Sequence, residues 1–148
     1  MTRSRERGVT LMELLTVVII LGIVAAIAIP SYRNYLLRAQ RVDATTALLR
    51  IAAAQEKFYL QNNTYASNDQ LDDAPPDGLG IGGTEHGYYS VAITKEDDLT
   101  VDYVATATPV DGGPQARDAD CATFTIDQAG ARIAKSKADA ENTATCWR

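Results

Sequence analysis

The stretch that decides the fold is Gly8–Pro30, GVTLMELLTVVIILGIVAAIAIP, near the amino terminus of a 148-residue chain. Glu13 is the only charged side chain between Arg7 and Arg33. The apolar run is about 20 residues long, which is the usual length of a membrane-spanning helix. The stretch therefore predicts a transmembrane helix that carries one carboxylate near its start.

Glu13 is costly in this position. A carboxylate at the centre of a bilayer costs on the order of 2.5–3.5 kcal/mol, and less near the interface. Such residues are candidates for functional sites because they need a partner, and we expect Glu13 to have one.

The charge of the chain argues against nucleic acid as a partner. There are 14 Lys and Arg against 19 Asp and Glu, which gives a net charge of −5 and a pI near 4.8. A nucleic-acid-binding domain is expected to carry a basic footprint. The charge is unevenly placed, because Arg3, Arg5 and Arg7 against Glu6 make the first seven residues basic.

Two interpretations of the amino terminus are open. In the first, Ala26-Ile27-Ala28 is the cleavage site of an ordinary secretory signal, and a soluble exported binding domain is released after Ala28. In the second, residues 1–8 are a leader and the apolar segment 9–30 is retained. Pro30 beside the first site and the charge of Glu13 favour the second.

The two cysteines, Cys121 and Cys146, lie in the last third of the chain, downstream of the apolar segment. In an exported domain such a pair predicts one disulfide, whereas in a cytosolic protein the two would be unrelated thiols. A disulfide of this loop length would add roughly 3–4 kcal/mol in the chain-entropy model.

Residues 31–61 continue the helical pattern. Asp43, Arg50 and Lys57 recur every seven residues and predict a solvent-exposed stripe. The opposite side carries Ala44, Leu48, Ile51, Ala52, Phe58 and Tyr59. Arg41, Thr45, Gln55 and Glu56 interrupt that apolar side, which suggests that part of it faces other chains. Leu11 to Gln61 would form one helix, with Gly22 and Pro30 as positions where it can kink or melt.

Residues 62–148 are expected to form a head domain. A loop rich in Asp, Gly and Pro follows the helix, and then four segments have strand character: 88–93, 99–108, 121–127 and 131–134. About four antiparallel strands packed on the amphipathic helix would bury both apolar faces. The predicted fold is α+β, a long helix on a small antiparallel sheet.

No catalytic or metal-binding pattern is present in the sequence. His86 is the only histidine, and Gly78–Gly83 has no following Gly-Lys-Ser/Thr. The pairs Asp72/Asp73, Asp97/Asp98 and Asp118/Asp120 do not fit a twelve-residue calcium loop. We expect a protein that is not an enzyme and that holds no cofactor or metal.

The amino terminus resembles the type IV pilins and the related type II secretion pseudopilins. The basic leader ending in Gly8, the glutamate at the fifth position after it, the apolar run, Gly22 and Pro30 all match the family's processing motif. Val9 stands where the family usually has phenylalanine. The resemblance implies that a prepilin peptidase cuts between Gly8 and Val9 and methylates the amine of Val9.

The resemblance also implies the function of a structural pilus subunit, major or minor, with a slight preference for a minor one. The Val9 amine of one chain would pair with Glu13 of the next and set the register of a filament for adhesion, twitching motility or DNA uptake. The implied partners are other pilin subunits, the inner-membrane assembly machinery and, before assembly, membrane lipid. The head would lie in the periplasm at first and in an extracellular pilus afterwards. A type II secretion pseudopilin is the alternative, although the cysteine pair favours a pilin.

Overall fold

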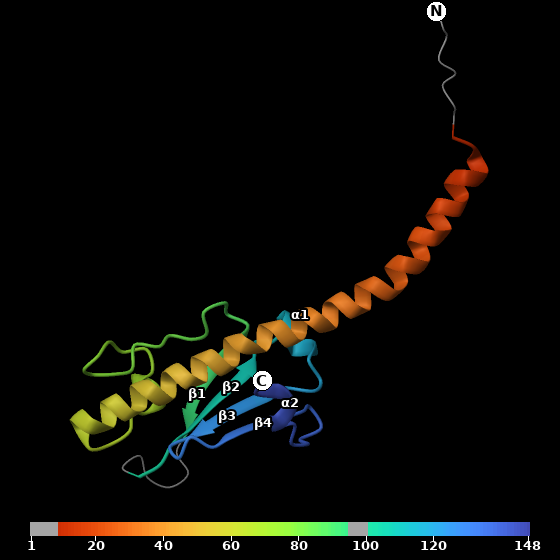
Figure 1. The fold of residues 1–148 in the computed structure, drawn as a ribbon. Helices are drawn as coiled ribbons and strands as arrows, with labels where there is room; N and C mark the ends of the chain where they lie inside the picture. The colour runs from red at the N-terminus through yellow and green to blue at the C-terminus, as the bar shows by residue number, and fades with distance from the viewer. Residues whose placement is uncertain (1–8, 95–100) are drawn as a thin grey trace, which may run out of the picture. The chain divides into compact units, whose positions relative to one another are not determined.

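The structure, a computed structural model, describes residues 9–94 and 101–148. Its longest element is helix α1, Leu11–Asn62, which contains Pro30 (Figure 1). The predicted helix ended one residue earlier, at Gln61, and is confirmed. The chain divides between Leu36 and Leu37 into two compact units, which are described separately below.

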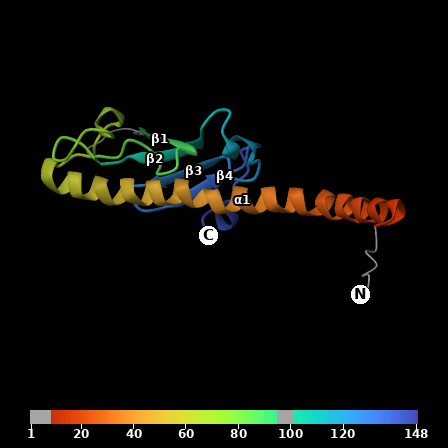
Figure 2. The same ribbon diagram turned by 90° about the horizontal axis from the view of Figure 1, so that it is seen from above.

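The second unit, the head, begins with the part of α1 from Leu37 onward. This part lies along one face of a four-stranded sheet (Figure 2). The predicted apolar side of the helix is buried, with Ala44, Leu48 and Ile51 fully covered. Helix and sheet therefore share one core, as two-layer packing requires.

Two details of the predicted helix faces are wrong. Asp43, placed on the solvent-exposed stripe, is buried, because it accepts hydrogen bonds from the loop that precedes the sheet. Arg41 and Gln55, suspected of facing other chains, are buried and bonded within the head. Arg50 and Lys57 are exposed as predicted.

The sheet is an antiparallel meander in the order β1-β2-β3-β4. Its strands are β1 (Tyr89–Thr94), β2 (Val104–Pro109), β3 (Thr123–Asp127) and β4 (Arg132–Lys135). Side chains alternate between the two faces along each strand. The inward face carries Tyr89, Ile93, Ala105, Ala107, Phe124, Ile126 and Ala134, all buried.

The second strand is shorter than predicted. It was expected to begin at Leu99, which lies outside the described residues, but it begins at Val104. Val104 pairs with Thr94, the last residue of β1, so Val101 lies beyond the paired strands and is 64% exposed. In the sequence, apolar residues already alternate before Val104, where pairing with β1 begins. Alternation alone therefore overestimated the length of β2.

Short elements complete the head. They are the 3-10 helices η1 (Asn68–Gln70) and η2 (Pro114–Arg117) and the helix α2 (Thr143–Cys146). The disulfide between Cys121 and Cys146 is present and connects the start of β3 to the carboxyl-terminal segment. The predicted α+β fold, a long helix on an antiparallel sheet, is confirmed.

Candidate assembly site

The first described residues form the start of α1. Val9 and Thr10 precede the helix and are exposed. The Thr10 hydroxyl accepts the backbone N–H of Glu13 at 3.2 Å, which satisfies one of the free donors of the first turn. Glu13 lies in that turn, where the positive end of the helix dipole favours a carboxylate.

No side chain among the described residues bonds the carboxylate of Glu13. The side chains from Leu14 to Ile29 are exposed as well, and the first unit offers them no core. This part of α1 is the one candidate membrane span among the described residues, with a mean hydropathy of 2.7 over its most apolar window. Both the apolar surface and the carboxylate therefore require an environment outside the single chain.

Gly22 and Pro30 both lie inside α1. A Cβ added at Gly22 would meet no atom within 4 Å. Nothing in the single chain therefore demands glycine at that position. Pro30 cannot donate a backbone hydrogen bond to the turn before it, which weakens the helix there.

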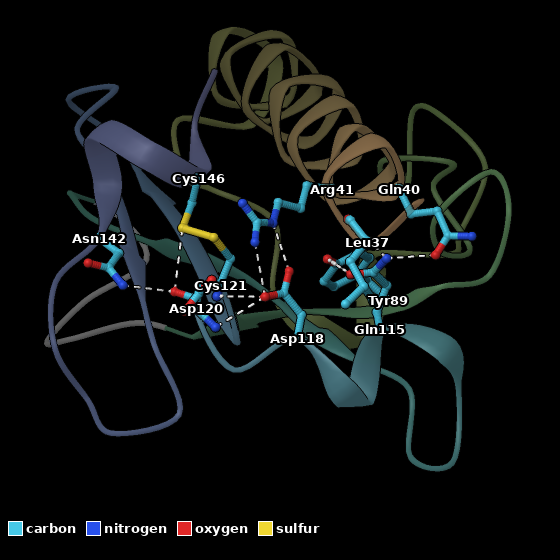
Figure 3. A network of polar contacts seen from close by, with 10 residues as sticks. All are labelled: Leu37, Gln40, Arg41, Tyr89, Gln115, Asp118, Asp120, Cys121, Asn142 and Cys146. Carbon is cyan, nitrogen blue, oxygen red and sulfur yellow. Dashed lines mark hydrogen bonds and ion pairs between the residues drawn. A yellow bond between two sulfur atoms is a disulfide. The ribbon is translucent and has the colours of Figure 1, made fainter. Parts of the chain in front are cut away.

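In the head, Arg41 of α1 and Asp118 form a buried ion pair (Figure 3). Arg41 Nε donates to Asp118 Oδ2 at 2.7 Å and a second guanidinium nitrogen donates to Oδ1 at 3.0 Å. Oδ1 also accepts the backbone N–H groups of Asp120 and Cys121. This bidentate pair fastens the helix to the segment that carries the disulfide.

Gln115, fully buried in η2, makes a second link between the same elements (Figure 3). Its amide nitrogen donates to the Leu37 carbonyl at 3.2 Å and to Gln40 Oε1 at 2.7 Å. Its oxygen accepts the hydroxyl of Tyr89 at 2.9 Å. Burial raises the pKa of Tyr89, so this hydroxyl remains a donor. The polar groups of Gln115 are thus satisfied where the head begins.

Asp43 joins α1 to the loop before β1. Its carboxylate accepts the N–H of His86 at 3.0 Å and that of Tyr88 at 3.2 Å, and His86 Nδ1 lies 3.2 Å away. Burial raises the pKa of Asp43, but hydrogen bonds from Thr84, His86 and Tyr88 together outweigh burial and lower it. His86 was expected to be a surface residue and its ring is exposed, but its Asp43 contact was missed.

The predicted site residues fall into three groups. Gly8, half of the cleavage site, lies outside the described residues, while Val9 and Glu13 lie near each other at the start of α1. Cys121 and Cys146 are joined. The described part of the chain contains no cluster of three or more metal-ligating side chains.

The residues that sequence reasoning missed are the buried polar ones, Arg41, Asp43, Gln115 and Asp118. A signal for Arg41 existed, because a charged residue in an apolar stripe either faces solvent or has a buried partner. No feature of the sequence identified its partner, Asp118, which lies 77 positions away.

Known proteins resemble the chain in both sequence and fold. Residues 30–125 match the family model described as "Type IV minor pilin ComP, DNA uptake sequence receptor", and residues 3–29 match the prokaryotic N-terminal methylation motif. A fimbrial protein of Pseudomonas aeruginosa is 36% identical over 107 residues, which is 68% of each chain.

Two further relatives extend the comparison. Type II secretion system core protein G of Pectobacterium carotovorum is 33% identical over 66 residues, 45% of this chain and 42% of that protein. The crystal structure of the Neisseria meningitidis minor pilin PilV has a TM-score of 0.50 at 18% identity, covers 72% of this chain and 93% of its own, and supports the fold alone. The processing motif, the helix-on-sheet architecture and these matches lead to one conclusion: the chain belongs to the type IV pilin family.

Proposed function

We propose that the chain is cut between Gly8 and Val9 and polymerises through α1 into a pilus. The observation that carries this proposal is the solvent-exposed apolar helix with one carboxylate, Glu13, at its start, which bonds no side chain among the described residues. In a filament, neighbouring helices would cover the apolar side chains. The Val9 amine of an adjacent subunit would supply the charge that Glu13 needs in a low-dielectric core.

We assign a different role to each successive segment of the chain. Residues 1–8 are the leader, 9–30 the membrane and assembly helix, 31–61 the helix that carries the head, and 62–148 the remainder of the head. Before assembly the helix spans the inner membrane with the head in the periplasm, and after assembly the head faces outward. A contact between different surfaces of successive subunits does not close on itself, so it builds a filament.

Intact-mass analysis of the mature chain tests the processing step. The expected mass begins at Val9, carries one added methyl group and lacks two hydrogens because of the disulfide. A mass beginning at Ile29 would show release by an ordinary signal peptidase and would overturn the proposal.

The pseudopilin alternative rests on the match to secretion protein G, which covers less of the chain than the fimbrial match. The two functions differ in where the assembled protein is found. A pilus subunit is expected in filaments sheared from the cell surface at natural expression levels. A pseudopilin is expected to remain with the cell envelope.

A local charge pattern favours DNA as a partner of the pilus subunit. Residues 131–148 contain four Lys or Arg against two Asp or Glu, although the whole chain is acidic. Arg132, Lys135, Lys137 and Arg148 are exposed, and the Arg132 guanidinium lies 5.4 Å from the ring centre of Trp147. A basic patch suits contact with the phosphates of DNA. The matched family model is described as a DNA uptake sequence receptor and supports DNA as a class of partner, but it covers residues 30–125 and does not include this patch.

Fluorescence anisotropy with duplex DNA tests this second function. The double variant Arg132→Ala/Lys135→Ala is expected to bind more weakly and with a smaller salt dependence. Arg50→Ala/Lys57→Ala, which removes the same charge from the exposed side of α1, is the matched control. Equal loss in both variants would show a nonspecific charge effect and contradict a site at β4.

A further inference from the structure

The two edges of the sheet differ in how their backbone groups are satisfied. At the β4 edge, the N–H of Ala134 donates to the Thr143 hydroxyl at 3.0 Å and its carbonyl accepts the N–H of Asn142 at 2.8 Å. The Trp147 ring nitrogen donates to the Ile133 carbonyl at 3.1 Å. The carboxyl-terminal segment thus covers this edge, which protects it from pairing with another chain.

Within the part of the chain that the structure describes, the β1 edge is covered only at its ends. The Thr84 hydroxyl bonds both the N–H and the carbonyl of Tyr89, at 3.4 and 3.0 Å. The Asn68 side chain accepts the N–H of Ile93 at 3.0 Å. Both residues satisfy backbone groups that would otherwise bind a neighbouring strand.

Between these two caps lies Val91. The Tyr88 carbonyl bonds the N–H of Val110, so the alternate residues after Tyr88 direct their backbone groups toward β2. Tyr89, Val91 and Ile93 direct theirs outward. No bond to the N–H or carbonyl of Val91 is made within the described part of the chain, so this residue offers one donor and one acceptor at the edge.

A groove with a volume of about 390 Å³ runs beside this edge. Leu71, Tyr89, Val91 and Val110 contribute apolar lining and Asn68 and Asp72 polar lining, and Gly82, Gly83 and Gly87 also border it. A Cβ built on Gly83 or Gly87 would meet no atom within 4 Å. The groove is therefore open at these two glycines, on a wall that it shares with Val91.

Among the described residues that line the groove, the one charged side chain is the acidic Asp72. Residues 62–94 contain five acidic side chains, Asp69, Asp72, Asp73, Asp77 and Glu85, and no Lys or Arg. Asp72 lines the groove, is exposed, and makes no ion pair with the described residues. A ligand that pairs its backbone with Val91 is therefore complementary if it carries a positive charge.

We propose that the β1 edge binds an extended, basic peptide segment of another protein, which adds a short strand at Val91 with a Lys or Arg near Asp72. Main-chain hydrogen bonds provide the affinity in this mode, and side-chain contacts provide the selectivity. The function goes beyond polymerisation through α1, because it uses the head alone.

The test uses the full mature chain in nonionic detergent and a labelled synthetic peptide of alternating lysine with valine or threonine. Val91→Pro removes the free N–H without touching the β1–β2 ladder, since proline is tolerated at edge positions. Val91→Thr keeps the N–H and is the matched control. We expect Val91→Pro to bind the peptide about tenfold more weakly than Val91→Thr, which corresponds to about 1.4 kcal/mol.

Two more variants test separately how the shape of the groove and its charge contribute to peptide binding. A side chain at Gly82 makes only an ordinary contact, 3.7 Å from Asp72 Oδ1, so Gly82→Val is expected to fill the groove and abolish binding while the head still folds. Asp72→Asn is expected to weaken the lysine peptide but not a serine analogue.

Three results would overturn the proposal. Equal binding by Val91→Pro and Val91→Thr would show that no strand is added. Equal binding of lysine and glutamate peptides would remove the charge argument. Light scattering that shows the chain self-associating through a Val91-dependent contact would make a second copy the occupant in place of a basic peptide.

Discussion

The head depends on a few buried polar residues of α1, each satisfied by a partner far away in the sequence. Arg41 has Asp118, Asp43 has the backbone of the loop before β1, and Gln55 exchanges two hydrogen bonds with the backbone of Ala66. A buried polar group costs free energy when its partner is lost. These residues therefore fix the position of each loop along the helix more sharply than apolar contacts alone.

Asp43 predicts how the stability of the head changes with acidity. The folded pKa of Asp43 is below the ordinary aspartate value of 3.8, so its contribution to stability is complete above pH 3.8 and is lost as the pH falls through the folded pKa. Asp43→Asn should lose about 1.5–3 kcal/mol at neutral pH and show a flatter decline in acid. Urea unfolding from pH 7 to pH 2 measures both.

His86→Ala is the control for Asp43. It removes the ring contact, which is one of the hydrogen bonds that lower the pKa of Asp43, and keeps the backbone donors of residues 86 and 88, so its acid decline should lie between those of the parent chain and Asp43→Asn. An Asp43→Asn variant that declines as steeply as the parent would contradict the assignment.

Because Arg41 and Asp118 form a buried ion pair, the single substitution Asp118→Asn is expected to lower the free energy of unfolding strongly. Asp118→Asn leaves the Arg41 guanidinium buried without its counter-charge, which typically costs about 3–5 kcal/mol. The exposed pair of Lys135 and Asp139 supplies the control, because Lys135→Ala should cost no more than about 1 kcal/mol. Similar losses of unfolding free energy in both variants would show that burial does not set the value of these pairs.

At the level of elements, the bounds of the long helix could be predicted almost to the residue. Its apolar run and the helical spacing that follows are compatible with no other regular secondary structure. The strands could be placed from alternation, but β2 could not be bounded. Tyr103 and Ala105 continue a pattern that begins with Leu99, and only the pairing of Val104 with Thr94 shows where the strand starts. The same limit explains Asp43, which has the spacing of an exposed residue and is buried by a loop 43 positions away.

Substitutions at Gly22 and Pro30 are expected to reduce assembly into filaments without affecting the single chain. A side chain at Gly22 meets nothing within its own helix surroundings, and Gly22→Ala with Pro30→Ala should stiffen α1 by removing the two weakest helix formers. We expect unchanged membrane insertion and a several-fold lower amount of the double variant in sheared filaments. Val24→Ala, an exposed position between them, is the control. Filament levels equal to those of the control would contradict a role for helix loosening.

At the scale of the whole molecule, the two units divide the work of a pilin. The head pairs the buried polar side chains of its helix, closes its carboxyl-terminal edge with the disulfide segment and folds around the helix from Leu37 onward. The first unit leaves its apolar side chains and Glu13 uncovered. The sequence predicted boundaries after Pro30 and after Gln61, whereas the two compact units meet between Leu36 and Leu37. The buried polar contacts within the head are long-range and were not predictable.

The measurement that tests the central claim most directly compares Glu13→Gln with the parent chain in two fractions, the membrane and sheared surface filaments. The expected result is an equal amount in the membrane and at least about a tenfold loss from filaments, since an unpaired Val9 amine in the filament core costs more than 1.4 kcal/mol. Glu13→Asp, which keeps the charge, should recover part of the loss. Filaments that contain Glu13→Gln at the level of the parent chain would contradict assembly through the pairing of Glu13 with Val9.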